Sequence, residues 1–348
     1  VAPTTQLASI SPVAVEAEEE RQREIVLIEL NKAQQRLDDI AFVLLEAATP
    51  LCEEDVAPRL GMSFGTVSQY GGEYEDAARS ALGLSDVLTL TSVSSGSPAE
   101  DAGLQEGDHL LAVGSSALPV GEEGVEVASE SIRRAALLGA VNLTIRRAGR
   151  EIEISVIPRD VCSYSATVTV EGGVNAFADG ERVVFSWAMM RFADDDELRT
   201  IVGHEIAHNA MGHLDAMQRN AMLGGLFGAA LDVLNESLND TPNQGANTAD
   251  QGANTTAFMN AGAEMHSQDF EREADYVGMY ILARANVDLE SSPDVWRQMG
   301  QINPSAIDYA SSHPSNAERF VRLTEAIEEI REKRSLGLEL LPEMRDPE

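Results

Sequence analysis

Residues 194–213 read DDDELRTIVGHEIAHNAMGH, which begins with aspartates suited to a helix N-terminus and continues with apolar residues at helical spacing. Within this predicted helix, His204 and His208 lie one turn apart and project together, so two imidazole nitrogens can bind one metal ion. Glu205 lies about 100° round the helix from His204. There it suits a base that takes a proton from water attacking a carbonyl. The stretch therefore predicts the zinc-binding helix of a hydrolase.

A third ligand is needed, because a catalytic zinc usually has three protein ligands and one open position. His213 is nine residues beyond His204, which on a continuing helix places it on the opposite face. The metzincin spacing needs glycine and histidine at the positions of Met211 and Leu214, so that class is excluded. Alternatively, the HExxH pattern arises by chance, and His204 and His208 are two surface histidines that only flank an ion pair.

A second predicted helix opens with FEREAD at residues 270–275. One of its faces carries Glu271, Ala274, Gly278 and Ile281. Glu271 therefore faces inward and needs a partner there. Asp275 lies one turn further on the same side, placed to accept an N–H from a metal-binding histidine. Glu273 points elsewhere and is expected to be solvated.

HEIAH (204–208) and EREAD (271–275) together resemble the gluzincin zinc peptidases of family M48, which include HtpX- and BepA-like enzymes and the CAAX prenyl proteases. The resemblance covers roughly residues 160–325. It implies one zinc ion per chain, Glu271 as the third ligand with Asp275 behind it, and hydrolysis of peptide bonds. Three further stretches agree: VNAFA (174–178) followed by Gly180, the strand at 182–186, and SHP (312–314) followed by Arg319.

The same resemblance implies residues that act on the substrate. In gluzincins the strand before the metal helix is an open edge that pairs with the substrate backbone. The residues expected to line the cleft here are Asn175, Ala176, Phe177 and Ala178. His313, held extended by Pro314, is expected near the zinc, either as a hydrogen-bond donor to the oxyanion or as a fourth ligand that shuts the resting enzyme. We favour the oxyanion role, with Arg319 as a second positive group in the cleft.

Short β-like runs occupy residues 87–157. The runs VNLTIRR (141–147) and EIEISVI (151–157), joined by Ala148-Gly149, predict a β-hairpin. The order of runs and the motifs SPA (97–99), AGL (102–104) and GD (107–108) resemble a PDZ domain. PDZ domains capture C-terminal peptides as an added strand.

The carboxylate-binding loop of such a module is expected just before its first strand, at Leu82, Gly83 and Leu84. A β module that only braces its neighbour is the alternative. Cys52 and Cys162 lie on the segments that enter and leave the module, which must run close together. They are expected to form a disulfide if the protein matures in an oxidising compartment, and to be two buried thiols otherwise.

The sequence thus predicts an α+β fold, a mostly helical zincin-type domain interrupted by a small PDZ-like domain. Residues 235–266 repeat QGANT and are polar, so a mobile loop is expected there. The predicted organisation is a flexible tail at 1–16, a helical N-terminal part of the catalytic domain at 17–83, the PDZ-like domain at 84–158, and the metallopeptidase domain at 159–348.

The net charge is −33 and the pI is near 4.4, which makes nucleic-acid binding unfavourable. No stretch reaches the 18 or more apolar residues of a membrane-spanning helix; residues 221–234 come nearest and fit a buried helix or a membrane-leaning one. Membrane association through a lipid anchor is compatible with this sequence.

The family branch without spanning helices points to the bacterial cell envelope, periplasmic or attached to the outer membrane. Damaged or unassembled envelope proteins are the expected substrates. The rival hypothesis is a PDZ-type adaptor with a latent, self-blocked metal site, against which the intact Glu205 argues.

Overall fold

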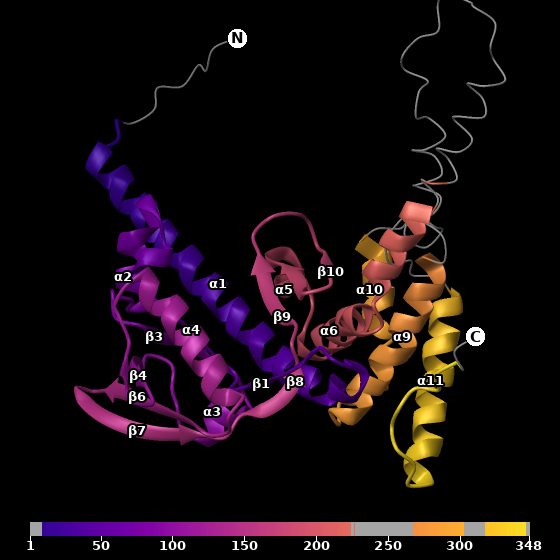
Figure 1. Cartoon of the computed structure of the whole chain (residues 1–348). Coiled ribbons are helices and arrows are strands. Elements are labelled where there is room, and N and C mark those ends of the chain that lie inside the picture. Colours follow the sequence, from indigo (N-terminus) through magenta and orange to yellow (C-terminus); the bar gives the residue numbers. More distant parts are fainter. Residues whose placement is uncertain (1–8, 224–225, 227–266, 303–316, 346–348) are drawn as a thin grey trace, which may run out of the picture. The chain divides into compact units, whose positions relative to one another are not determined.

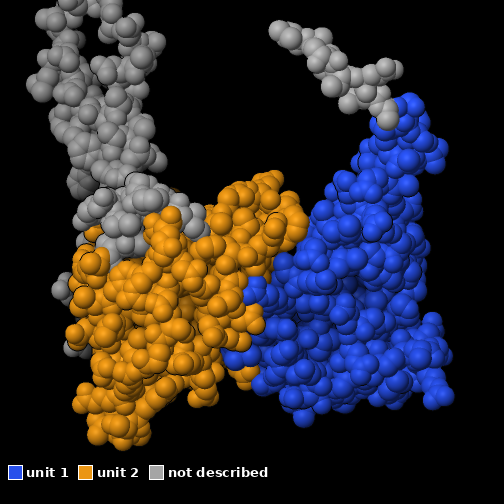
Figure 2. Space-filling view, turned by 180° about the vertical axis from the view of Figure 1, so that it is seen from behind, with its two compact units in different colours: residues 1–43, 57–161 blue, residues 44–56, 162–348 orange. Residues whose placement is uncertain are grey.

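A computed structural model describes residues 9–223, 226, 267–302 and 317–345 of the chain. The fold is α+β, and two compact units divide it (Figure 2). Unit 1 comprises residues 1–43 and 57–161, and unit 2 comprises residues 44–56 and 162–348. The expected loop at 235–266 lies outside the described residues. Within the described part, no helix combines the length and apolar character needed to cross a membrane.

Unit 1 begins with the long helix α1 (Pro12–Ala48). Its start lies within the predicted tail at 1–16, because Pro12 fits the first helical position, where a missing N–H costs nothing. The apolar stripe of α1 packs inside the unit, with Leu27 buried in a cluster that includes Val67 and Leu84. Gln35 also donates from Nε2 to the Thr91 carbonyl at 3.0 Å.

An antiparallel sheet forms the rest of unit 1, with strand order β2-β3-β4-β6-β7 and β5 paired to β4. The strands are β2 (Met62–Gly65), β3 (Thr89–Val93), β4 (His109–Val113), β5 (Ser116–Ala117), β6 (Val141–Arg147) and β7 (Arg150–Val156). Helix α4 (Glu122–Ala136) covers one face of this sheet (Figure 1), and the short α3 (Pro98–Asp101) precedes β4. The expected hairpin is β6–β7, and both of its turn residues have positive φ, 49° at Ala148 and 75° at Gly149.

The sheet begins before the expected boundary at residue 84. Strand β2 pairs with β3, and helix α2 (Glu75–Leu82) packs its buried Ala77 and Ala78 in the same cluster as Leu84. Residues 57–83, assigned from the sequence to the catalytic domain, therefore group with the β module. The strands β1 (Val56–Arg59) and β8 (Arg159–Cys162) pair where the chain enters and leaves this unit.

Unit 2 combines a three-stranded sheet with a group of helices. The sheet order is β10-β11-β9, with β11 antiparallel to β10 and parallel to β9. The elements are β9 (Ser165–Thr169), β10 (Ala176–Ala178), β11 (Arg182–Ser186), α5 (Trp187–Phe192), α6 (Asp195–Ala210), α9 (Ser267–Arg284), α10 (Asp294–Ile302) and α11 (Ala317–Ser335). Helix α9 packs against both α6 and α11 (Figure 1).

Residues 44–56 are tied into unit 2 by covalent and polar links. Cys52 and Cys162 form a disulfide with their Cα atoms 5.8 Å apart. Arg284 of α9 donates from Nε to the Ala47 carbonyl at 2.7 Å. The segment that precedes β1 is therefore anchored to the helices that carry the candidate site.

Candidate metal centre

Helix α6 begins with a capping box formed by Asp194 and Glu197. Asp194 Oδ1 accepts from the N–H groups of Asp196 and Glu197, both at 3.0 Å, and Glu197 Oε2 accepts from the Asp194 N–H at 2.9 Å. The helix then buries Ile201, Val202, Ile206 and Ala207. This start and this buried face fix the orientation of the histidines that follow.

His204 and His208 of α6 meet Glu271 of α9. The two Nε2 atoms lie 3.1 Å apart, and they lie 3.4 Å and 3.3 Å from Oε2 and Oε1 of Glu271. A tetrahedral zinc with bonds of about 2.0–2.1 Å holds its ligand atoms roughly 3.3–3.5 Å apart. The three side chains therefore fit one zinc ion, and they form the one such group among the described residues.

Charge in the site also favours a cation. Burial lowers the pKa of His204, but hydrogen bonds and charges of Asp275 and Glu271 outweigh it and raise that pKa to about 9. Burial lowers the pKa of His208, so this imidazole is neutral at pH 7, as a metal ligand must be. The carboxylates that hold a proton on His204 would equally hold a metal cation.

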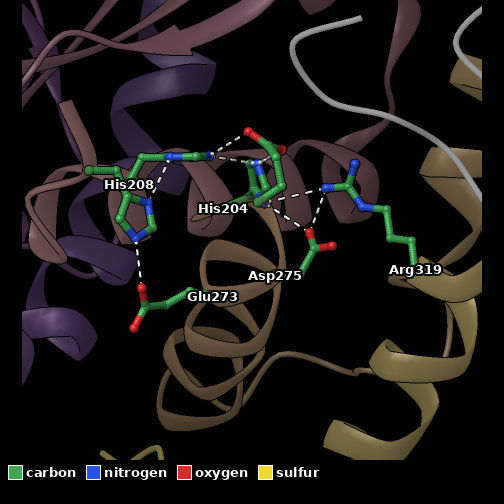
Figure 3. A network of polar contacts seen from close by, with 7 residues as sticks. His204, His208, Glu273, Asp275 and Arg319 are labelled. Atoms are coloured by element: carbon green, nitrogen blue, oxygen red, sulfur yellow. Dashed lines mark hydrogen bonds and ion pairs between the residues drawn. The ribbon is translucent and has the colours of Figure 1, made fainter. Parts of the chain in front are cut away.

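Asp275 supports His204 from behind. Its Oδ1 lies 2.9 Å from His204 Nδ1 and also accepts from Arg319 Nη2 of α11; in Figure 3 the carboxylate sits between the two side chains. Burial raises the pKa of Asp275, but Arg319 and His204 outweigh it and lower that pKa. The ionised carboxylate fixes the Nδ1–H tautomer of His204, which leaves Nε2 for the metal.

Arg319 is buried where it contacts Asp275. Its guanidinium carbon lies 3.3 Å from the ring centre of Trp296 on α10, and that ring makes an edge contact with His204 at 5.2 Å. Arg319 therefore supports Asp275, and its expected role as a catalytic positive group stays a prediction. Nothing in the sequence singled out Trp296. His313 lies outside the described residues, so its role stays a prediction.

His213 contradicts its expected position, whereas Glu273 is exposed, as expected. His213 is 2% exposed, and its Nδ1 lies 2.9 Å from His208 Nδ1. Its Nε2 lies 3.1 Å from Oε2 of Glu273, and this hydrogen bond lowers the pKa of Glu273 (Figure 3). Placement on the opposite face assumed a continuing helix, but α6 ends at Ala210 and Gly212 follows with φ of 62°. The chain turns back, and His213 reaches the second ligand.

The expected substrate strand lies beside the metal helix. Strand β10, with Ala176 to Ala178, forms an edge of its sheet, and Phe177 is 43% exposed. Asn175 is tied to β11, donating its N–H to Ser186 Oγ at 3.1 Å. Asn209, which sequence reasoning missed, accepts from the Gly180 N–H at 2.9 Å and donates to the Arg182 carbonyl at 3.0 Å. It therefore fastens the β10–β11 turn to α6.

The expected carboxylate-binding loop has another use in the structure. Leu82 ends α2, and Gly83 follows with φ of 64°. The N–H groups of Gly83 and Leu84 both donate to the Ala78 carbonyl. These groups cap the helix and are not presented to a peptide carboxylate, so this assignment is corrected. Glu205 is buried on α6, directly after His204, and its expected role as the base stays a prediction.

The model of the family described as "Peptidase family M48" matches residues 143–327, more than half of the chain. The chain belongs to peptidase family M48. That assignment agrees with the donor set, because His204, His208 and Glu271 all lie within the matched range.

Curated relatives match over the same region. The chain is 29% identical over 168 residues to the mitochondrial metalloendopeptidase OMA1 of Arabidopsis thaliana, which covers 47% of this chain and 32% of that protein. It is 32% identical over 126 residues to the beta-barrel assembly-enhancing protease of Escherichia coli O157:H7, covering 34% of this chain and 25% of that protein. The matches thus span a third or less of these relatives. A solved structure, the HtrA3 PDZ domain bound to a phage-derived ligand, is 21% identical, covers 30% of this chain and 88% of that chain, and has a TM-score of 0.22.

Proposed function

We propose that this chain is a zinc-dependent metalloendopeptidase that hydrolyses peptide bonds in proteins. The observation that carries the proposal is the set of three donors from α6 and α9, spaced for one zinc, with Glu205 directly after His204. A purely binding protein would have no chemical need for a base at that position. The metalloendopeptidase names of the relatives support the same reading.

The roles of the side chains follow from their positions. His204, His208 and Glu271 would hold a zinc ion, which would act as a Lewis acid toward a peptide carbonyl and water. Glu205 takes the proton from the attacking water and passes it to the departing amine. Asp275 and Arg319 keep His204 in the tautomer that presents Nε2 to the metal. His313 remains the proposed donor to the oxyanion.

The substrate backbone is proposed to pair with β10. An edge strand offers unpaired N–H and C=O groups to an extended peptide. Asn209 holds this hairpin at a fixed place on the metal helix. A peptide added to β10 would therefore run past the helix that carries Glu205.

Damaged or unassembled proteins of a bacterial envelope are the proposed natural substrates. The disulfide between Cys52 and Cys162 is typical of an oxidising compartment. The relative named a beta-barrel assembly-enhancing protease is also bacterial. Other relatives are named mitochondrial, so the disulfide and the bacterial relatives are what support the envelope.

Metal analysis and proteolysis test the enzyme. We expect about one zinc per chain and casein hydrolysis by the wild type. The Glu205→Gln variant should keep the zinc and lose proteolysis, whereas His208→Ala should lose both. Proteolysis retained in Glu205→Gln would refute the mechanism.

Recruitment of chain ends by the PDZ-like module is tested separately, by peptide binding. A peptide with a free C-terminus should bind the full chain more tightly than its amidated twin, because the carboxylate carries the recognition. Equal affinity for the two peptides would assign a bracing role to the module.

A further inference from the structure

We propose that His213 and Glu273 form a hydrogen-bonded pair that positions the metal ligand His208. The inference rests on the proposed zinc site and extends it to two residues outside the ligand set. Its basis is a line of contacts that runs from the ligand through a buried imidazole to a carboxylate at the surface.

The ring of His208 has one nitrogen for the metal and one for His213. Its Nε2 lies with the other donors, 3.3 Å from Glu271 Oε1. A nitrogen that binds a metal ion must present its lone pair, so the proton of a neutral His208 sits on Nδ1. That N–H then donates to His213 Nδ1, 2.9 Å away.

The protons of His213 follow from this assignment. Because its Nδ1 accepts, its proton lies on Nε2, which donates to Oε2 of Glu273 at 3.1 Å. In this arrangement each nitrogen along the line has a partner of the correct type. The ring of Phe270 stacks on His213 with centroids 4.8 Å apart and planes at 25°, which holds the imidazole in this orientation.

The two histidine ligands are therefore supported in different ways. His204 rests on a buried carboxylate that is itself paired with Arg319. His208 rests on the imidazole of His213, which fixes the ring without placing a carboxylate directly beside it. The Glu273 side chain is 48% exposed, so water can replace its oxygen, whereas no water can take the place of the buried His213 ring. His213 should thus matter more than Glu273.

Zinc affinity, measured by competition with a chelator of known affinity, tests the pairing. His213→Phe keeps a ring that can stack on Phe270 but has no acceptor, and it should bind zinc roughly 10- to 100-fold more weakly. His213→Gln offers an amide oxygen to His208 and should recover part of that loss. Glu273→Gln should stay within a few-fold of the wild type. His109→Phe, on β4 of unit 1, serves as the control and should not change zinc affinity.

The variants separate positioning from packing. If the ring of His213 only filled space, His213→Phe would bind zinc as tightly as the wild type, and His213→Gln would be the weaker of the two; that order would overturn the inference. Circular dichroism of the metal-free variants checks that each one folds. A wild type that binds no zinc would instead refute the proposed function itself.

Discussion

At the scale of single residues, Asp38 on α1 is a carboxyl group whose surroundings oppose its charge. Gln34 donates from Nε2 to its Oδ1 at 2.7 Å, and Ser63 donates to its Oδ2 at 3.4 Å. Burial raises the pKa of Asp38 more than these hydrogen bonds lower it, and the neighbouring charge of Asp39 raises it further. A carboxyl group with a raised pKa in the folded state ionises more easily when the chain unfolds. Above its unfolded pKa, near 3.9, Asp38 therefore opposes folding.

Replacement of Asp38 by asparagine should stabilise unit 1 at neutral pH. Asparagine keeps an oxygen that accepts from Gln34, its NH2 group can donate to the Ser63 hydroxyl, and it carries no charge to bury. We expect Asp38→Asn to unfold at a higher temperature than the wild type at pH 7, with the gap closing as the pH falls through about 4. Thermal unfolding followed by circular dichroism between pH 7 and pH 3.5 measures this. Glu126→Gln on the exposed face of α4 removes the same charge, and an equal effect of both variants would contradict the argument.

The metal ligands show how far single residues can be predicted from a sequence. His204 and His208 follow from helical periodicity alone, and Glu271 needed the resemblance to a family as well. His213 was misplaced because its position depends on where α6 ends. Glycine with positive φ commonly follows the last residue of a helix, and Gly212 has this conformation. Gly212 is therefore the local signal in the sequence that α6 ends before His213. Trp296 is far along the chain and carries no local signal.

At the scale of elements, the site depends on a close crossing of α6 and α9. A Cβ built on Gly278 would meet backbone atoms of His204 and Gly203 at 3.2–3.3 Å. Backbone atoms cannot rotate away as a side chain can. The absence of a side chain at Gly278 therefore lets α9 approach α6 closely enough for Glu271 to meet the two histidines.

Two glycine substitutions in this crossing should have opposite consequences. Alanine gains about 1 kcal/mol over glycine in a helix interior, but overpacking costs about 1–3 kcal/mol. Gly278→Ala should therefore lower the unfolding temperature and weaken zinc binding. In Gly203→Ala the nearest atoms lie at 3.5 Å, an ordinary contact, so that variant should be as stable as the wild type or more stable. Differential scanning calorimetry measures the unfolding temperatures of the two variants. Equal unfolding temperatures would contradict the close crossing of α6 and α9.

Regular elements with a strong local pattern were predictable, and short ones were not. The β6–β7 hairpin follows from alternation and a glycine turn. Strand β2 has four residues, MSFG, too few to show a period, and its partner β3 begins only at Thr89. The domain boundary was set too late for that reason, since pairing with a distant strand is invisible in a local window.

At the scale of the whole molecule, charge is the dominant feature. The chain has 58 acidic and 25 basic residues, and Lys32 and Lys333 are its only lysines. Many arginines are held in exposed pairs one turn away on the same helix, such as Arg133 with Glu130. Exposed pairs of this kind contribute little to the free energy of unfolding. They do not offset the repulsion among the excess carboxylates, which acts against the compact state.

Added salt should therefore stabilise this protein. The screening length falls from about 30 Å at 0.01 M to about 3 Å at 1 M, so the repulsion among separated carboxylates is removed. The exposed ion pairs weaken as well, but their small contribution makes that the lesser effect. We expect the unfolding temperature to rise with sodium chloride by on the order of a few degrees. The rise should be steepest at low salt, where the screening length is still longer than the spacing of the surface charges. Sucrose stabilises by exclusion and not by screening, so it should give no such steep early rise. An unfolding temperature that falls with sodium chloride would mean that the ion pairs outweigh the net charge.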